Sequence, residues 1–160
     1  MKNITGNAAQ YKKQMEYFFN SLESEKKYFN LTMERLLKWE LIMIEVSGDE
    51  IIAVAGLEKK WGIVRNNLMI KKEHQGRGLG KQIIDELVDE IKKKYAMVMA
   101  VISEQNSGSI KLHLQKGYRR IGRRQTLDYL IKPINQKGVV VYFLMKTFFP
   151  FLKVADMIRR

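Results

Sequence analysis

The stretch of sequence that decides the fold reads Lys71-Lys72-Glu73-His74-Gln75-Gly76-Arg77-Gly78-Leu79-Gly80-Lys81. It follows a strand-like run, Asn67 to Ile70, and precedes apolar residues spaced as on the buried face of a helix: Ile83, Ile84, Leu87, Val88 and Ile91. A glycine-rich turn that opens into a helix is typical of an anion site, because unpaired backbone N–H groups and the helix dipole favour negative charge there. The turn also carries Arg77 and Lys81, so it indicates a phosphorylated ligand.

Three phosphate-loop patterns can be compared with this turn. A Walker A loop would need glycine at position 75 and Ser or Thr at position 82, and both positions hold glutamine. A dinucleotide fingerprint needs GxGxxG, whereas these glycines are spaced GxGxG. The pattern Gln-x-x-Gly-x-Gly is met in full by Gln75, Gly78 and Gly80. In this respect the chain resembles the GNAT superfamily of acetyl-CoA-dependent N-acetyltransferases, whose pyrophosphate loop has this form between a central strand and a helix.

A second motif supports the resemblance. The strand-like run from Ala96 to Val101 is followed by Asn106, then by a helical stretch from Ser109 to Lys116 that ends in Gly117-Tyr118. Strand, Asn, helix and Gly-aromatic in this order resemble the second half of a GNAT domain, and Gly117 suits the left-handed end of a helix. Together the two motifs extend the resemblance over about residues 41–124.

The resemblance implies an α/β (α+β) fold, with a mixed, bent central sheet flanked by helices and the acyl-CoA in the splay between two central strands. We expect a single domain over residues 1–160, with its core at 41–146 and an apolar, then basic, tail at 147–160. Hydrophobic patterns predict helices within Asn7–Leu37, the second of them including Tyr28 and Leu31. They predict strands at Leu41–Val46, Ile51–Leu57, Trp61–Ile70, Tyr118–Arg124 and Val139–Lys146, with a short first strand at Lys2–Thr5.

The resemblance also assigns cofactor contacts. Backbone groups of Met69 and Ile70 would hold the pantetheine arm and polarise the thioester carbonyl. The pyrophosphate would sit on the amides of the loop, with charge from Arg77 and Lys81; the residues concerned are Gln75, Gly76, Arg77, Gly78, Leu79, Gly80 and Lys81. Asn106 occupies the position where family members often bind the pantetheine arm, although asparagine is equally common as a helix N-cap.

The acid and the base are less well defined. Family members commonly place a tyrosine, the general acid to the departing thiolate, where this chain has His113. An imidazole can donate a proton, but its reference pKa of about 6.5 leaves it largely neutral at pH 7; a surface or half-buried structural histidine is the alternative. Glu73 is a weak candidate for the base, Glu58 another, and each also suits a solvated surface.

Composition narrows the function further. Without cysteine the chain has no disulfide and no thiol to carry an acyl-enzyme, so transfer would be direct. Its two histidines, His74 and His113, are far apart, and we expect no metal. No apolar run approaches the roughly 20 residues of a membrane span, and we expect a cytoplasmic protein. The tail suits core packing or a homodimer contact better than a membrane surface.

The net charge of +12 is the unusual bulk property. It favours an anionic partner, although lysine-rich helices also serve solubility. A small or nucleotide-linked amine is the first expectation for the acceptor, followed by a protein or an aminoacyl-tRNA. Four arginines, at 119, 120, 123 and 124, would either bind an anion or protect an edge strand. Strand alternation would place Arg119 and Arg123 on one face and Arg120 and Arg124 on the other. The alternative function is a non-catalytic acyl-CoA-binding module whose basic surface engages nucleic acid.

Overall fold

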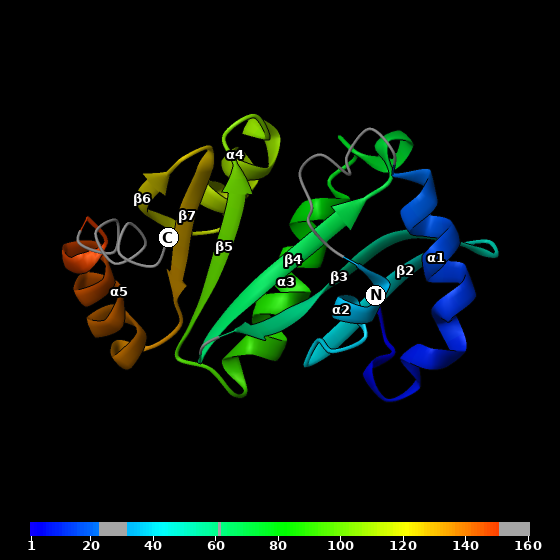
Figure 1. The fold of residues 1–160 in the computed structure, drawn as a ribbon, viewed down its shortest axis with the longest axis horizontal. Coiled ribbons are helices and arrows are strands. Elements are labelled where there is room, and N and C mark those ends of the chain that lie inside the picture. The colour runs from blue at the N-terminus through cyan, green and yellow to red at the C-terminus, as the bar shows by residue number, and fades with distance from the viewer. Residues whose placement is uncertain (23–31, 61, 151–160) are drawn as a thin grey trace, which may run out of the picture. The chain divides into compact units, whose positions relative to one another are not determined.

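The computed structural model describes residues 1–22, 32–60 and 62–150, and the chain divides into two compact units, Met1–Asp89 and Glu90–Arg160. Figure 1 traces the order of the elements by colour. The first unit begins with β1 (Lys2–Asn3), the 3-10 helix η1 (Thr5–Tyr11), α1 (Lys12–Ser21) and α2 (Met33–Leu36). It continues with β2 (Leu41–Ser47), β3 (Glu50–Lys60), β4 (Ile63–Ile70), the 3-10 helix η3 (Lys72–His74) and most of α3 (Leu79–Lys92). The second unit contains β5 (Met97–Ser103), α4 (Ser107–Gln115), β6 (Arg119–Arg124), β7 (Leu127–Pro133) and α5 (Gln136–Phe148).

In the first unit, β1, β2, β3 and β4 pair in this order, each antiparallel to the next. Side chains alternate between the two faces of the sheet. One face carries an apolar core in which Met15 and Phe18 of α1 pack with Ile44, Val54 and residues from the other elements. The apolar residues of α3 expected from the sequence, Ile83, Ile84, Leu87, Val88 and Ile91, are all buried.

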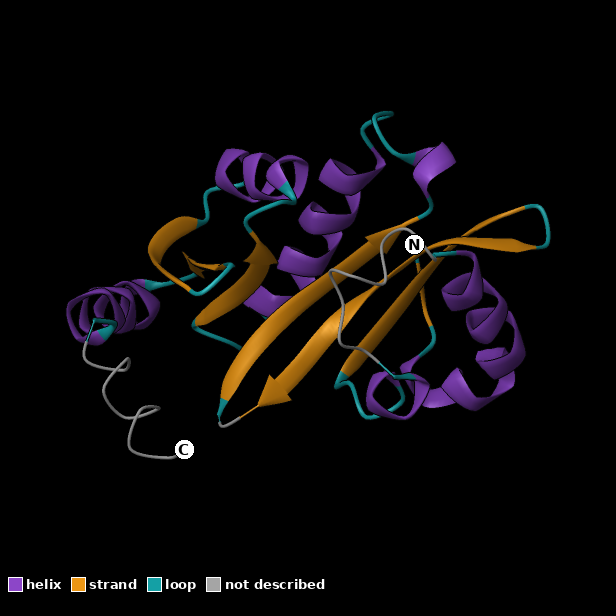
Figure 2. Ribbon diagram, turned by 45° about the horizontal axis from the view of Figure 1, so that its top comes forward, coloured by secondary structure: helices purple, strands orange, loops and turns teal. Residues whose placement is uncertain are grey.

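In the second unit, β7 lies between β5 and β6, antiparallel to both, which leaves β6 at an edge. Figure 2 distinguishes these strands from the helices. α5 approaches closely through two glycines. A Cβ added to Gly138 would lie 1.9 Å from the carbonyl oxygen of Ala96, and one added to Gly122 would lie 2.2 Å from the ring of Phe149. A side chain at Gly138 would therefore displace the start of α5 from Ala96, and one at Gly122 would displace the ring of Phe149 at the C-cap of α5.

The prediction of a strand at Val139–Lys146 is wrong, because these residues belong to α5. The run of valines and aromatics favours a strand by propensity, but the side chain of Asn135 caps a helix by accepting from the N–H of Gly138 at 3.1 Å. Buried residues then recur at helical spacing, at Gly138, Tyr142 and Phe149. The last strand is instead β7, which lies between the two segments where the last strands were expected.

Most other expectations agree with the structure. The chain is α/β, with strands flanked by helices, and the short N-terminal strand forms as β1. The strand expected at Trp61–Ile70 forms as β4, from Ile63 to Ile70. The predicted helical positions Tyr28 and Leu31 lie outside the described residues, as do positions 151–160 of the tail. The single-domain organisation stays a prediction.

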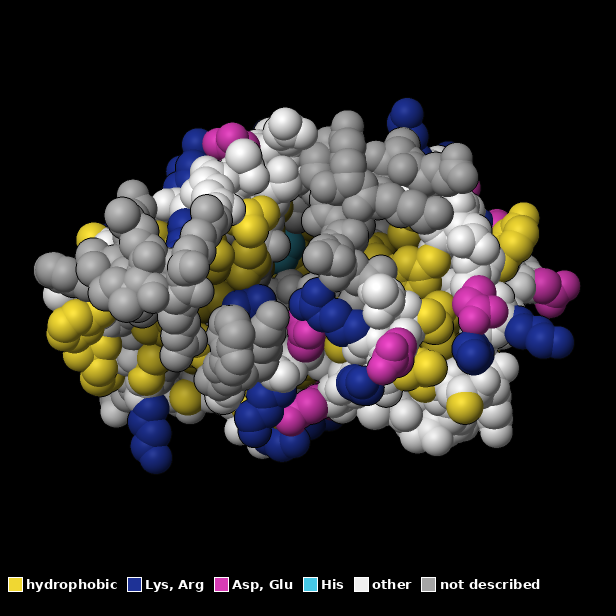
Figure 3. All heavy atoms as spheres, viewed as in Figure 1, with side chains coloured by type: hydrophobic (Ala, Val, Ile, Leu, Met, Phe, Trp, Pro, Cys, Tyr) yellow, Lys and Arg dark blue, Asp and Glu magenta, His cyan; other side chains and the backbone are white. Residues whose placement is uncertain are grey.

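One face of α5 exposes large apolar side chains. Their exposed fractions are 60% for Val140, 57% for Phe143, 52% for Leu144 and 56% for Phe148. Hydrophobic atoms gather over α5 at the left of Figure 3. None of the helices in residues 1–22, 32–60 and 62–150 is long and apolar enough to cross a membrane.

Candidate functional site

The glycine-rich loop is fastened to the end of β4 by the side chain of Gln75. Its Nε2 donates to the carbonyl oxygen of Ile70 at 2.8 Å. The chain between them turns through η3, where the backbone N–H of His74 donates to the carbonyl of Lys71 at 2.9 Å. The glutamine of the motif therefore fixes where the glycines begin relative to the strand, a structural role that its position in the sequence alone does not show.

The loop leaves a row of backbone donors unpaired. Gly76 and Gly78 adopt φ values of 77° and 85°, in the left-handed region that favours glycine. Helical hydrogen bonding starts when Lys81 N–H donates to the carbonyl of Gly78 at 3.0 Å. From Gly76 to Gly80, none of the five backbone N–H groups donates a hydrogen bond within the described part of the chain. Consecutive free amides at the start of a helix form a nest for an anion.

The charged residues of the loop are open to solvent. Arg77 and Lys81 are exposed next to the free amides, as a contact with a phosphate requires. Glu73 is also exposed, on η3, and His74 is half-buried. The first unit thus brings together the predicted residues from Met69 to Lys81 at the end of β4 and the start of α3.

In the second unit, Asn106 is the N-cap of α4. Its Oδ1 accepts from the backbone N–H of Ser109 at 3.1 Å, and its own N–H donates to the carbonyl of Ser103 at 2.9 Å. The capping role weighed in the sequence is therefore present. It uses the side-chain oxygen and leaves the amide nitrogen of Asn106 for a further acceptor.

His113 is buried in the last turn of α4, with 3% of its surface exposed, so a surface or half-buried position is wrong. Its Nδ1 lies 2.8 Å from the carbonyl oxygen of Ser109. Because a carbonyl oxygen can accept but not donate, this contact places a proton on Nδ1. The ring also meets Tyr118 edge-on, with 4.9 Å between ring centroids.

Burial changes the protonation of both aromatic residues. Desolvation lowers the pKa of His113 below its usual 6.5, and the hydrogen bond to the backbone of Ser109 opposes this in part. Burial likewise raises the pKa of Tyr118 above its usual range. At neutral pH, His113 is therefore neutral to a greater extent than a free histidine.

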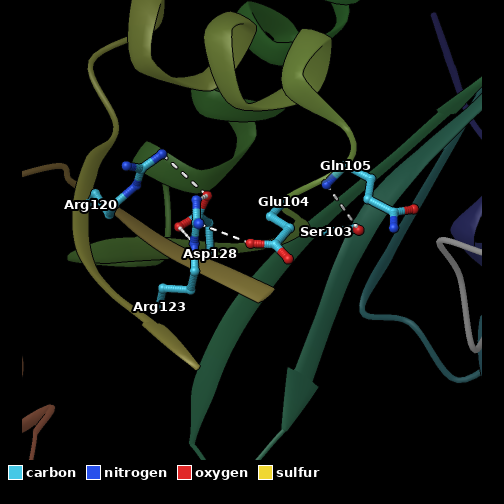
Figure 4. Close-up of polar contacts among 6 residues, drawn as sticks. All are labelled: Ser103, Glu104, Gln105, Arg120, Arg123 and Asp128. Atoms are coloured by element: carbon cyan, nitrogen blue, oxygen red, sulfur yellow. Dashed lines mark hydrogen bonds and ion pairs between the residues drawn. The ribbon is translucent and has the colours of Figure 1, made fainter. Parts of the chain in front are cut away.

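The arginine cluster on β6 is partly neutralised by carboxylates. Asp128 of β7 is fully buried, and it accepts from Arg120 at 3.2 Å and from Arg123 at 3.0 and 3.1 Å. Arg123 also pairs with Glu104 at 2.8 Å. Figure 4 shows both arginines directed at the same aspartate. The prediction that Arg120 and Arg123 lie on opposite faces is wrong, because both reach Asp128. The pairing of β6 with β7 shifts register between Arg120 and Gly122, which interrupts the strict alternation of faces.

These contacts give two of the four arginines in the predicted cluster, Arg120 and Arg123, a structural role. The Asp128 carboxylate raises the pKa of Arg123, and β6 is the edge strand of its unit, as one of the two interpretations held. Within residues 1–22, 32–60 and 62–150, no three His, Cys, Asp or Glu side chains are grouped so that they could hold a metal ion.

Comparison with known proteins finds one family and several relatives. The family model described as FR47-like protein matches residues 46–127, just over half of the chain. The L-methionine sulfoximine/L-methionine sulfone acetyltransferase of Salmonella typhimurium is 39% identical over 57 residues, and the L-amino acid N-acyltransferase MnaT of Escherichia coli is 37% identical over 57 residues. Each match covers 34% of this chain and 33% of the relative, so the matched segment spans about a third of either relative's length.

Solved structures share the fold at low identity. The GNAT domain of S. lividans PAT superposes with a TM-score of 0.68 and 14% identity, covering 78% of this chain and 85% of that one. The Salmonella typhimurium acetyltransferase yncA, solved with its cofactor acetyl-CoA, superposes with a TM-score of 0.56 and 20% identity, covering 68% and 77%. The fold is thus that of GNAT proteins.

Proposed function

Because this chain belongs to the FR47-like family, within the GNAT superfamily, we propose that it is an N-acetyltransferase that moves an acetyl group from acetyl-CoA to the primary amine of a small molecule. The observation that carries this proposal is the row of unpaired amides from Gly76 to Gly80 beside the exposed Arg77 and Lys81. These groups suit a pyrophosphate, and coenzyme A contains one.

The proposed reaction is direct transfer. The neutral amine nitrogen attacks the carbonyl carbon of the thioester, a C–N bond forms, and the C–S bond then breaks. The amine loses one proton and the departing thiolate gains one, so the products are an amide and coenzyme A. The sequence contains no cysteine that could hold the acetyl group in between.

The backbone of Met69 and Ile70 is proposed to hold the pantetheine arm and to polarise the carbonyl, and the amide nitrogen of Asn106 to donate to the same arm. His113 is the candidate proton donor to the thiolate. Since its pKa is lowered, it would first have to take up a proton, such as the one that the attacking amine releases. Glu73 is the proposed candidate for the base, because Arg35 already donates to both oxygens of the other candidate, Glu58.

A small amine acceptor is supported by the matched relatives, which are named for amino acids and for analogues of methionine. A nucleotide-linked amine, a protein or an aminoacyl-tRNA are the further acceptors that the positive charge allows. The alternative of a nucleic-acid-binding module gains no support, because Arg120 and Arg123, half of the arginine cluster, already pair with carboxylates. The exposed apolar face of α5 is the feature that supports a homodimer.

A panel of amines tests the proposed activity. The purified chain is incubated with acetyl-CoA and each amine, free thiol is followed with time, and the acetylated product is identified by mass. Release of thiol that depends on both the protein and an amine, with matching N-acetyl product, is expected. If no amine is acetylated and the thioester is hydrolysed no faster than in buffer, the proposal fails. The Glu73→Gln variant, assayed across pH, tests the base.

A further inference from the structure

Three buried donor atoms meet no acceptor within the described residues: Nε1 of Trp39, Nε of Arg65 and Nδ2 of Asn67. Arg65 and Asn67 are two residues apart on β4, so their side chains leave the same face of the sheet. Gly56 lies opposite Asn67 on β3, and a Cβ added to Gly56 would lie 2.6 Å from the Trp39 ring. The indole of Trp39 therefore packs over Gly56, on the same face of the sheet as Arg65 and Asn67.

The carboxylate placed to satisfy Arg65 is already engaged. Glu58 lies directly opposite Arg65 in the β3–β4 register, but Arg35 of α2 donates to its two oxygens at 2.6 and 2.7 Å. Among the described residues, no carboxylate forms an ion pair with Arg65. In this part of the chain no ion pair compensates the positive charge of Arg65, and the other two donors without acceptors lie on the same face of the sheet.

This arrangement matters because buried donors without partners are rare and costly. Each costs about 1–3 kcal/mol, and native structures keep few of them. All three atoms can donate, and none is placed to accept. The Nε of an arginine, together with a terminal nitrogen, binds the two oxygens of a carboxylate in parallel hydrogen bonds. A ligand with two anionic oxygens in one plane is the chemistry that satisfies them.

We propose that Arg65, Asn67 and Trp39 bind the carboxylate of the acceptor, so that the acceptor is an amino acid or another amino-carboxylic acid. The proposal rests on the proposed function, in which the acetyl group is held at Met69. Asn67 precedes Met69 by two residues, about 7 Å along the strand. A carboxylate bound at Asn67 therefore brings the amine of the same small molecule toward the thioester carbonyl.

Binding can be tested without turnover, through the indole N–H of Trp39. The full chain, labelled with ¹⁵N, is titrated with three pairs of probes that differ by one carboxylate: alanine and ethylamine, leucine and 3-methylbutylamine, and phenylalanine and 2-phenylethylamine. The Trp39 resonance is assigned from the Trp39→Phe variant. At least one amino acid should shift this signal saturably, while its decarboxylated partner does not. If no amino acid shifts it more than its partner, the proposal is overturned.

Two variants separate recognition of the carboxylate from a general loss of structure. Arg65→Gln removes the cation, and Asn67→Asp keeps the shape but turns the donor into a repelling acceptor. For the amino acid, each should raise KM about 10- to 100-fold, while kcat and the acetyl-CoA affinity change little. For the decarboxylated amine, KM should stay the same. Lys13→Gln, at an exposed position on α1, also removes one cation; it is the control and should leave both KM values unchanged.

The outcomes distinguish this inference from the proposed function. If both members of every pair are acetylated equally well, the carboxylate site is wrong and the acetyltransferase stands. If leucine moves the Trp39 signal, and Arg65→Gln abolishes this, but no amine is acetylated, the carboxylate site stands and the proposed reaction fails. If Arg65→Gln leaves the response to the amino acid unchanged, Arg65 does not bind the carboxylate.

Discussion

The Nδ1 atom of His113 lies 2.8 Å from the carbonyl oxygen of Ser109, one turn earlier on α4. This contact fixes which ring nitrogen carries the proton in the neutral form, and it holds the imidazole inside the second unit. The pKa of His113 is lowered chiefly because burial removes the ring from water. His113 should therefore affect both the pH dependence of stability and the rate of transfer.

The first prediction concerns acid stability. Because the pKa of His113 is lower in the folded than in the unfolded chain, the unfolded chain binds the proton first as pH falls. The contribution of His113 to stability is therefore complete above about pH 6.5 and declines below it, by at most about 1.4 kcal/mol per pH unit. Urea unfolding measures the free energy of unfolding at pH 7.5 and at pH 5.5. Its decrease between the two pH values should be smaller for His113→Asn than for the natural chain. If His113→Asn and a His74→Asn control lose stability to the same extent as the natural chain, this account of His113 is wrong.

The second prediction concerns catalysis by His113. If it protonates the thiolate, His113→Gln should lower kcat at least about 100-fold and leave the acetyl-CoA affinity unchanged. Stopped assays with a good amine, together with calorimetric titration of the same variant, measure the two separately. An unchanged kcat would leave His113 with a structural role alone and assign the proton to another donor or to water.

The third prediction concerns the buried carboxylate of Asp128. Asp128→Asn keeps the shape but removes the charged acceptor of Arg120 and leaves Arg123 with Glu104 as its carboxylate partner. We expect the free energy of unfolding to fall by about 2 kcal/mol, less than for a fully buried pair, because both arginines are nearly half exposed. Denaturant titration measures this. Asp49→Asn, in the exposed turn between β2 and β3, is the control, and an equal effect of the two variants would contradict the prediction.

The fourth prediction concerns the apolar face of α5. If this face joins two copies of the chain, the mass measured by light scattering should rise with concentration toward that of a dimer. Phe143→Ser should lower that mass, whereas Val46→Ser, at an isolated exposed position on β2, should not. A monomer at every concentration would exclude this contact.

The loop and α3 could be predicted from the sequence because local chemistry determines them. Glycines at Gly76 and Gly78 take up positive φ values, and the apolar spacing after Gly80 is that of a helix with one buried face. The C-terminal half was harder to predict. The β-branched run from Val139 favours a strand by propensity, but these residues form a helix. The start of that helix packs through Gly138 against Ala96, a contact between distant residues that local sequence does not reveal.

The polar face at Arg65 and Asn67 could not be found from sequence for a similar reason. Within the described residues Arg65 has no carboxylate partner because Arg35, distant in the sequence, engages Glu58. The burial of His113 also depends on tertiary packing, since nothing in the sequence of α4 separates a buried ring from a half-exposed one.

The central claim is that the loop from Gly76 to Gly80 binds the pyrophosphate of acetyl-CoA. Calorimetric titration with acetyl-CoA, with ATP and NAD as controls, tests it most directly in the natural chain, in Gly78→Ala and in Gly6→Ala. We predict that acetyl-CoA alone binds tightly. Gly78→Ala should weaken binding about tenfold, because alanine disfavours the left-handed backbone by about 1–2 kcal/mol, and Gly6→Ala should have no effect. Absence of binding at millimolar acetyl-CoA, or equal affinity in all three proteins, would contradict the account.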